Sequence, residues 1–285
     1  MSNSIKLNAL QMAEFCAQGV IRFDGIVPEE LNERAIKELR AGEIPNQGPG
    51  VPLFDHFKAG TTMGDMLRLP EVLGAIESLV GAAPTFDHQF AHVRGPEETQ
   101  AQHLHADAII DPRDMAFDIQ LFYFPHDITE DMGGTMFVPG THLRRVNEMD
   151  IAMYRNVRGL QRFSGKAGTV MIFHHGVWHA GGCNKSDQWR TMFKIRMNPT
   201  VHQTGLADFS DLEELWAADK SDPMFMWMLK DQKSLFHTLA KAAPWFETAG
   251  GRLEVANRCR FFRYVSGAED FDIDYWLSRV ENVPA

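Results

Sequence analysis

The chain has 285 residues, of which 44% are hydrophobic and 23% are charged, so it is long and apolar enough to bury a sizeable core. Its formal net charge of −10 argues against the basic surface of a nucleic-acid-binding protein or a polybasic membrane patch. The three cysteines are too few, and odd in number, for a disulfide framework, which suits a reducing compartment.

The sequence contains neither a secretory signal nor an apolar run of about 18 residues, the length of a membrane span. We therefore expect a cytoplasmic protein without nucleic acid or membrane partners. No repeat or linker divides the chain, so a single domain over residues 1–285 is predicted. Its expected parts are helical support over residues 1–84, a β core over about 85–200 and a mainly helical segment over 205–285.

The first part of the chain carries start and stop signals for helices and for one strand. Asn8 and Gln11 have the spacing of a capping box, which opens a helix. The other elements expected here are a strand over Val20–Phe23, a helix from Pro28-Glu29-Glu30 to Ala41-Gly42, and a helix from Pro70 to about Val80.

The middle of the chain is rich in short β-type runs separated by Gly/Pro turns. The expected strands are Phe117–Phe124, Thr135–Val138, Gly168–Phe173 and Thr191–Met197. Many short strands with such turns favour a barrel or a jelly roll, so the expected fold is mainly β with flanking helices. From Asp208 onward the pattern is helical again, with a dense Met, Phe and Trp cluster at 224–228.

Nine of the twelve histidines lie between His88 and His179, and histidine is the commonest metal ligand. Within this region, His105 and Asp107 would lie on the same face of a strand, because side chains two residues apart share a face. An imidazole beside a carboxylate supplies two of the three ligands in a facial triad for non-haem iron. A His103–His105 pair, or a simple polar strand face, is an open alternative.

His179 ends one expected strand, and Arg190 begins the next, eleven residues later across a Gly-rich loop. Such a hairpin can bring a metal ligand and a guanidinium to one pocket, where the planar fork of arginine suits a carboxylate. The alternative is an ordinary hairpin with a surface arginine. A helical zinc pair formed by His175 and His179 is disfavoured by Gly176 and the preceding β run.

A third feature runs from Gly134-Thr135 through a Pro139-Gly140 turn to His142, which by itself is a strand and a turn. The order of the three features resembles the phytanoyl-CoA dioxygenase family of Fe(II)/2-oxoglutarate-dependent oxygenases. In that family a Gln-x-x-His-x-Asp stretch precedes a Gly-rich strand ending in Pro-Gly-Ser/Thr-His, then a distal His and an Arg eleven residues later. The resemblance covers roughly residues 10–200.

The resemblance implies a double-stranded β-helix of the jelly-roll or cupin type. It also implies that His105, Asp107 and His179 hold Fe(II), leaving open positions for 2-oxoglutarate and O2. Arg190 would pair with the far carboxylate of 2-oxoglutarate, and Gln102 and Thr135 match positions that contact this co-substrate in relatives. No catalytic residue beyond the metal site is implied, and the resemblance does not identify the substrate-binding residues.

The sequence departs from the family pattern at one position. Many relatives have a serine two residues after the distal histidine, where this chain has Gly181. Another hydroxyl, such as that of Thr135, must then help Arg190, or the contact is absent. Asp107 follows the pattern, whereas relatives that halogenate have a small residue at that position, so its presence favours hydroxylation or another C–H oxidation.

The expected function is that of a 2-oxoglutarate-dependent dioxygenase that hydroxylates a small organic molecule or an acyl conjugate, releasing succinate and CO2, with ascorbate helpful in vitro. Residues 142–166 carry six Lys/Arg and two Asp/Glu, a set that either receives a carboxylate or phosphate of the substrate or forms a solvated loop. Open alternatives are desaturation, cyclisation or epimerisation in a biosynthetic pathway, a non-catalytic jelly-roll binding protein, and a cupin-like metalloenzyme without 2-oxoglutarate.

Overall fold

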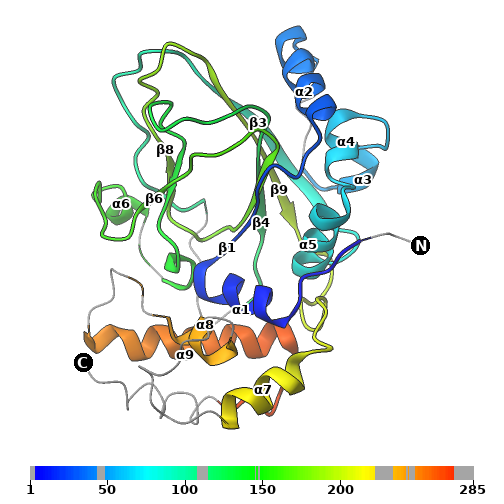
Figure 1. Ribbon diagram of the computed structural model, residues 1–285, viewed down its shortest axis with the longest axis vertical. Coiled ribbons are helices and arrows are strands. Elements are labelled where there is room, and N and C mark those ends of the chain that lie inside the picture. The colour runs from blue at the N-terminus through cyan, green and yellow to red at the C-terminus, as the bar shows by residue number, and fades with distance from the viewer. Residues whose placement is uncertain are drawn as a thin grey trace.

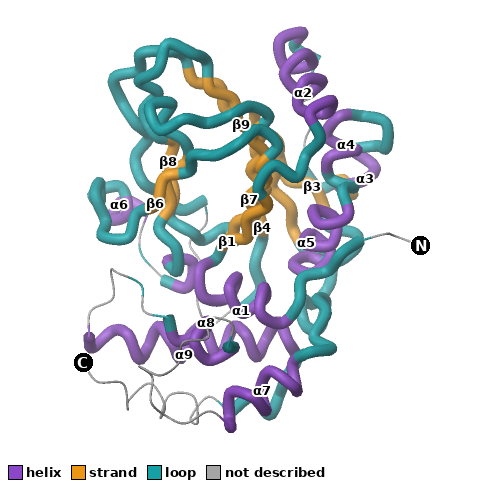
Figure 2. The backbone as a smooth tube through the Cα atoms, viewed as in Figure 1, coloured by secondary structure: helices purple, strands orange, loops and turns teal. Residues whose placement is uncertain are grey.

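The computed structural model describes residues 4–43, 49–107, 115–144, 146, 148–221, 234–241, 243 and 248–272. Within these residues, two antiparallel sheets face each other, and helices cover the outer face and one end of the larger sheet (Figures 1 and 2). None of the described helices is long and apolar enough to cross a membrane.

The larger sheet, over the described residues, has six strands in the order β1-β7-β4-β9-β3-β2, and all neighbouring strands are antiparallel. Its strands are β1 Val20–Phe23, β2 Val51–Pro52, β3 Thr85–Arg94, β4 Ile119–Phe124, β7 Thr169–His174 and β9 Arg190–Asn198. The smaller sheet has the order β6-β5-β8, with β5 Thr135–Phe137, β6 Gln161–Arg162 and β8 His179–Gly181.

Helices pack on the outer face of the larger sheet and below both sheets. α1, α8 and α9 lie side by side under the sheets, α3 contacts β2 and β3, and α2 contacts α4 (Figure 1). The described helices are α1 Ala9–Gln18, α2 Glu29–Ala41, α3 Leu53–His56, α4 Thr62–Met66, α5 Pro70–Val80, α6 Glu148–Ile151, α7 Leu212–Ser221, α8 Leu235–Ala240 and α9 Thr248–Ser266, with a 3-10 turn η1 at Thr141–Leu143.

The central strands are buried on both faces, and each face packs against a different layer. On β4, Leu121 and Tyr123 pack into the helix-covered core, whereas Phe122 and Phe124 face the smaller sheet. β7 is buried along its whole length, as its nearly continuous apolar sequence predicts. Each fully buried large apolar side chain contributes about 1.5–3 kcal/mol, so this double packing fixes the position of the strands that border the space between the sheets.

The expected mainly β fold with flanking helices is confirmed. The capping box of Asn8 and Gln11 opens α1, and the expected bounds of β1, α2 and α5 agree with the structure. The region before residue 85 contains one strand more than expected, because the short β2, which pairs with β3, is present in addition to the expected strand β1. That residues 1–285 form a single domain stays a prediction, and the cluster at 224–228 lies outside the described residues.

One strand of the expected β core was not named from the sequence, and one local expectation of a strand was wrong. β3 was not predicted, because histidine and arginine occupy its inward positions where a core strand would carry apolar residues. The stretch 102–107 is not a strand, since only His105 forms a β-bridge, with His179.

Candidate active site

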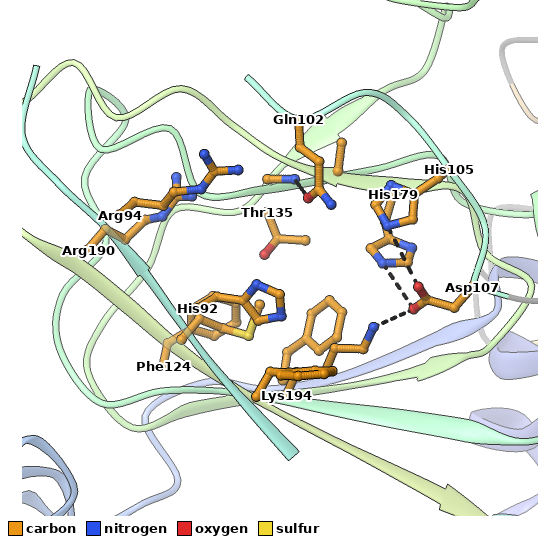
Figure 3. A pocket seen from close by; sticks show the side chains of 15 residues that line it. His92, Arg94, Gln102, His105, Asp107, Phe124, Thr135, His179, Arg190 and Lys194 are labelled. Carbon is orange, nitrogen blue, oxygen red and sulfur yellow. Dashed lines mark hydrogen bonds and ion pairs between the residues drawn. The ribbon is translucent and has the colours of Figure 1, made fainter. Parts of the chain in front are cut away.

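A cavity of about 190 Å3 lies between the two sheets (Figure 3). Its walls come from β3, β4 and β9 of the larger sheet, from β5 and β8 of the smaller sheet, and from the stretch before Asp107. The cavity brings together all six residues that the sequence singled out, namely Gln102, His105, Asp107, Thr135, His179 and Arg190.

Two of these side chains are held together by their own backbones. The N–H of His105 donates to the carbonyl of His179 at 3.0 Å, and the N–H of His179 donates back at 2.8 Å. This reciprocal pair ties the loop that carries Asp107 to strand β8. His105 and His179 are brought together by this bridge and not by the strand that we expected. Asp107 follows two residues after His105.

Both imidazole rings are oriented by a backbone carbonyl. Nδ1 of His105 lies 2.9 Å from the carbonyl oxygen of His103, and Nδ1 of His179 lies 2.9 Å from that of Val177. A carbonyl oxygen only accepts, so Nδ1 carries the hydrogen in each ring, and Nε2 presents a lone pair. The two Nε2 atoms lie 3.7 Å and 3.4 Å from the carboxylate oxygens of Asp107.

The three side chains form a donor set that fits a metal ion. One ligand atom from each of His105, Asp107 and His179 lies within 4.8 Å of the other two. Two imidazoles and one carboxylate are the donors of the facial triad of non-haem Fe(II) oxygenases. Hydrogen bonds from Nδ1 to a carbonyl are the usual second partners of metal-binding histidines, because they fix the ring orientation.

A buried lysine lies beside this donor set. Nζ of Lys194 on β9 donates to Oδ2 of Asp107 at 2.6 Å (Figure 3). Burial by itself would raise the pKa of Asp107, but the neighbouring His179 and Lys194, the latter through its charge and its hydrogen bond, outweigh it and hold that pKa well below its usual range. Asp107 is therefore an anion at neutral pH, as a metal-binding carboxylate must be.

Arg190 lies at the opposite end of the cavity from Asp107 (Figure 3). Its Nη1 donates to the carbonyls of Met132, at 2.6 Å, of Gly182, at 3.0 Å, and of Gly133. The guanidinium is thus fixed by backbone acceptors. Burial, together with the charge of the nearby Arg94, lowers the pKa of Arg190 to about 10, so the group still carries its charge at neutral pH.

Gln102 and Thr135 lie between these two ends. Oε1 of Gln102 accepts from the N–H of Gly181 at 2.9 Å, which fixes the side-chain amide against β8. Thr135 is buried on β5, opposite Gly181 in the strand register, and its hydroxyl borders the cavity (Figure 3). The cavity therefore contains the hydroxyl of Thr135, although this chain has Gly181 where many relatives have a serine.

The sequence did not predict the contribution of β3 to the cavity. His92 and Arg94 both line it, and burial followed by the charge of Lys194 lowers the pKa of His92 to about 4, so this ring is neutral. His92 and Arg94 are two residues apart, so they share one face of a strand. This spacing indicates a shared cavity face only once β3 is known to pair with β9. Apolar wall residues complete the cavity, among them Phe122, Phe124 and Met192.

The remaining histidines of the His-rich region have other positions. His103 is exposed and lies outside the donor set. His142 and His174 are buried together beneath the sheets, with ring centroids 4.8 Å apart. His175 follows β7 and is not helical, so the helical zinc pair is wrong, although its Nε2 lies 4.0 Å from Asp107.

Solved structures with the same fold include 2-oxoglutarate-dependent enzymes. The non-haem, α-ketoglutarate-dependent carbocyclase SnoK from nogalamycin biosynthesis is 19% identical, with a TM-score of 0.52, 68% of this chain and 87% of that chain being covered. Iron-bound HygX from Streptomyces hygroscopicus is 14% identical, with a TM-score of 0.52 and coverages of 69% and 88%. The epimerase SnoN, also from nogalamycin biosynthesis, is 18% identical, with a TM-score of 0.51 and coverages of 67% and 83%.

At these identities the structures establish the fold alone. Among curated proteins, no sequence is significantly similar to this chain. The sequence profile described as phytanoyl-CoA dioxygenase matches residues 26–192, more than half of the chain, and this range contains both the donor set and Arg190. The chain belongs to the phytanoyl-CoA dioxygenase family, whose members are non-haem iron enzymes that depend on 2-oxoglutarate.

Proposed function

We propose that this protein hydroxylates a small organic molecule or an acyl conjugate, with 2-oxoglutarate and O2 as co-substrates and with succinate and CO2 as by-products. The observation that carries the proposal is the arrangement of one cavity. A histidine–aspartate–histidine donor set lies at one end, and a buried guanidinium lies at the other. 2-Oxoglutarate needs both groups, because its keto acid end chelates the metal while its far carboxylate pairs with a cation.

In this proposal His105, Asp107 and His179 hold Fe(II). Bound iron supplies the oxidising chemistry, in which O2 converts 2-oxoglutarate to succinate and CO2 and one oxygen atom is inserted into a C–H bond of the substrate. The protein contributes preset ligands, since both rings are already oriented by carbonyls. It also keeps Asp107 ionised next to Lys194.

Arg190 binds the far carboxylate of 2-oxoglutarate in this proposal. Its backbone partners hold Nη1 in place, so little side-chain entropy is lost when the co-substrate binds. Thr135 and the amide nitrogen of Gln102 are the polar groups between the guanidinium and the donor set, and we assign them to the same ligand. Phe122 and Phe124 line the cavity with apolar surface, which excludes water around the reacting groups.

The experiment that tests the function is a turnover assay with purified protein, Fe(II), ascorbate and 2-oxoglutarate, in which succinate is measured. His179→Ala should abolish Fe(II) binding, whereas Arg190→Ala should retain Fe(II) and weaken 2-oxoglutarate binding. His103→Ala is the matched histidine control, because His103 is exposed and outside the donor set. The proposal fails if the unaltered protein neither binds 2-oxoglutarate nor forms succinate.

Mass spectrometry of the products distinguishes hydroxylation from the alternatives that the sequence left open. Hydroxylation adds one oxygen atom to the substrate. Desaturation and ring closure remove two hydrogens, and epimerisation leaves the mass unchanged. A substrate panel of small natural-product scaffolds and acyl conjugates, with succinate formation as the first readout, would identify which class accelerates turnover above the uncoupled rate.

A further inference from the structure

A second guanidinium lies beside Arg190 at the same end of the cavity. Arg94 is the last residue of β3, and the register of the β3–β9 pair places it directly opposite Arg190. Both side chains extend into the cavity side by side (Figure 3). Two like charges this close repel each other, and the effect of Arg94 on the pKa of Arg190 has that sign.

Among the residues that the structure describes, one carboxylate, that of Glu98, is bonded to this pair, and it neutralises only part of the pair's charge. Oε1 of Glu98 lies 3.3 Å from Nη1 of Arg94, and Oε2 of Glu98 accepts from the N–H of Asn184 at 3.3 Å. The pair with Glu98 is an i, i+4 contact at the rim, where Arg94 keeps 29% of its side-chain surface exposed. Two guanidiniums beside one carboxylate leave a net positive charge, which a second carboxylate would neutralise.

The geometry around Gly181 indicates where that carboxylate would lie. A Cβ atom built on Gly181 would lie 3.3 Å from Nη2 of Arg94 and 3.6 Å from Nη2 of Arg190. The Nη2 atoms of both arginines therefore point to the same spot beside β8, while their Nη1 atoms are bonded to Glu98 and to backbone carbonyls. A carboxylate with two oxygens can accept one hydrogen bond from each.

We propose that Arg94 binds the far carboxylate of 2-oxoglutarate together with Arg190, and so takes the part that the serine at position 181 has in many relatives. This inference rests on the proposed function, and it names a co-substrate-binding residue that the sequence pattern lacks. Glycine at position 181 leaves this space to the guanidinium, because a Cβ there would lie only 3.3 Å from Nη2 of Arg94 and from Oε1 of Gln102.

Equilibrium binding to the Fe(II)-loaded protein without O2, measured by titration calorimetry, tests the inference independently of activity. Arg94→Gln should weaken 2-oxoglutarate binding by about 10- to 100-fold, the loss expected for one charge-assisted hydrogen bond. Glu98→Gln is the matched control, because it breaks the same ion pair from the other side. If Arg94 served only that pair, the two variants would weaken binding equally, whereas we expect Glu98→Gln to keep or increase the affinity.

A second ligand and a second variant make the test specific. 2-Oxobutyrate has the keto acid end but no far carboxylate, so its affinity should be the same in Arg94→Gln and in the unaltered protein. Adding Gly181→Ser to Arg94→Gln should restore part of the lost 2-oxoglutarate affinity, because the hydroxyl then has room. The role of Arg94 is refuted, but the proposed function is not, if Arg94→Gln still binds 2-oxoglutarate tightly or if it loses affinity for both ligands equally. If the unaltered protein does not bind 2-oxoglutarate, the proposed function is refuted as well.

Discussion

Lys194 should stabilise the metal-free protein and oppose metal binding. Its Nζ lies 2.6 Å from Oδ2 of Asp107, and the two side chains are only 9% and 18% exposed. Lys194→Met keeps the apolar stem and removes the charge, which leaves the carboxylate without its cation. Breaking a buried ion pair from one side costs 3–5 kcal/mol, and the residual exposure of Asp107 favours the lower end, about 3 kcal/mol.

With a divalent cation bound, Asp107 already has a positive partner. The loss of Lys194 should then cost about 1 kcal/mol, the net value of one hydrogen bond. The thermodynamic cycle assigns the difference of about 2 kcal/mol to metal affinity, so Lys194→Met should bind Fe(II) about 30-fold more tightly. The assays are anaerobic Fe(II) titration and thermal unfolding, where about 2 °C per kcal/mol predicts Tm decreases of about 6 °C without metal and about 2 °C with it.

Lys166→Met is the matched control for this prediction. Lys166 and Asp127 form an ion pair of almost the same N···O distance, 2.7 Å, but their side chains are 82% and 51% exposed. Exposed pairs contribute little, so neither Tm nor metal affinity should change measurably. If Lys194→Met lowers Tm equally with and without metal, or weakens Fe(II) binding, the argument that lysine and metal compete for Asp107 is wrong.

Three further predictions follow from the packing. In Gly182→Ala the added methyl group would overlap the carbonyl of Gly133, which accepts a hydrogen bond from Arg190. We therefore expect stability to fall by about 1–3 kcal/mol and the Kd for 2-oxoglutarate, measured by calorimetry, to rise several-fold. An unchanged Kd would contradict this prediction. Tyr123→Phe should lower the free energy of unfolding in urea by about 1–3 kcal/mol, because the buried Oδ1 of Asn32 loses its 2.6 Å donor, and a loss well below this range would refute it. Burial lowers the pKa of His174 to about 3. Between about pH 6.5 and pH 3 the ring is therefore protonated in the unfolded chain but neutral in the folded protein. Stability should therefore fall with decreasing pH between those values, by about 1.4 kcal/mol per pH unit for this group, and His174→Gln should reduce the slope; equal slopes would exclude His174 as the group responsible.

The features that the sequence predicted well are those with local causes. The first turn of α1 is closed by Asn8 and Gln11, three residues apart, so the chain itself contains both partners. β7 was predicted because burial on both faces requires an apolar residue at almost every position. The donor set of His105, Asp107 and His179 was implied by the resemblance to the phytanoyl-CoA dioxygenase family and not by a local cause, and the structure brings the three together even though the expected strand around His105 is absent.

The features that the sequence missed depend on pairing between distant segments. β3 has polar residues on its cavity face, so its strand character is visible only through the pairing with β9. Lys194 lies in the expected strand Thr191–Met197, but its position beside Asp107 depends on how the segment around His105 bridges to β8. Arg94 escaped notice for the same reason, since 96 residues separate it from the arginine that it faces.

Charge relates the two ends of the cavity to each other. At the metal end the charges of Asp107 and Lys194 cancel, and at the far end Glu98 offsets only one of the two arginines. A divalent cation bound alone would add to this positive excess, whereas a dianion bound alone would lack a partner for its keto acid end. Each ligand therefore removes an electrostatic penalty on the other, which favours a site that binds metal and dicarboxylate together. The positive excess of the two arginines at the far end thus favours co-substrate binding directly and metal binding through the bound co-substrate.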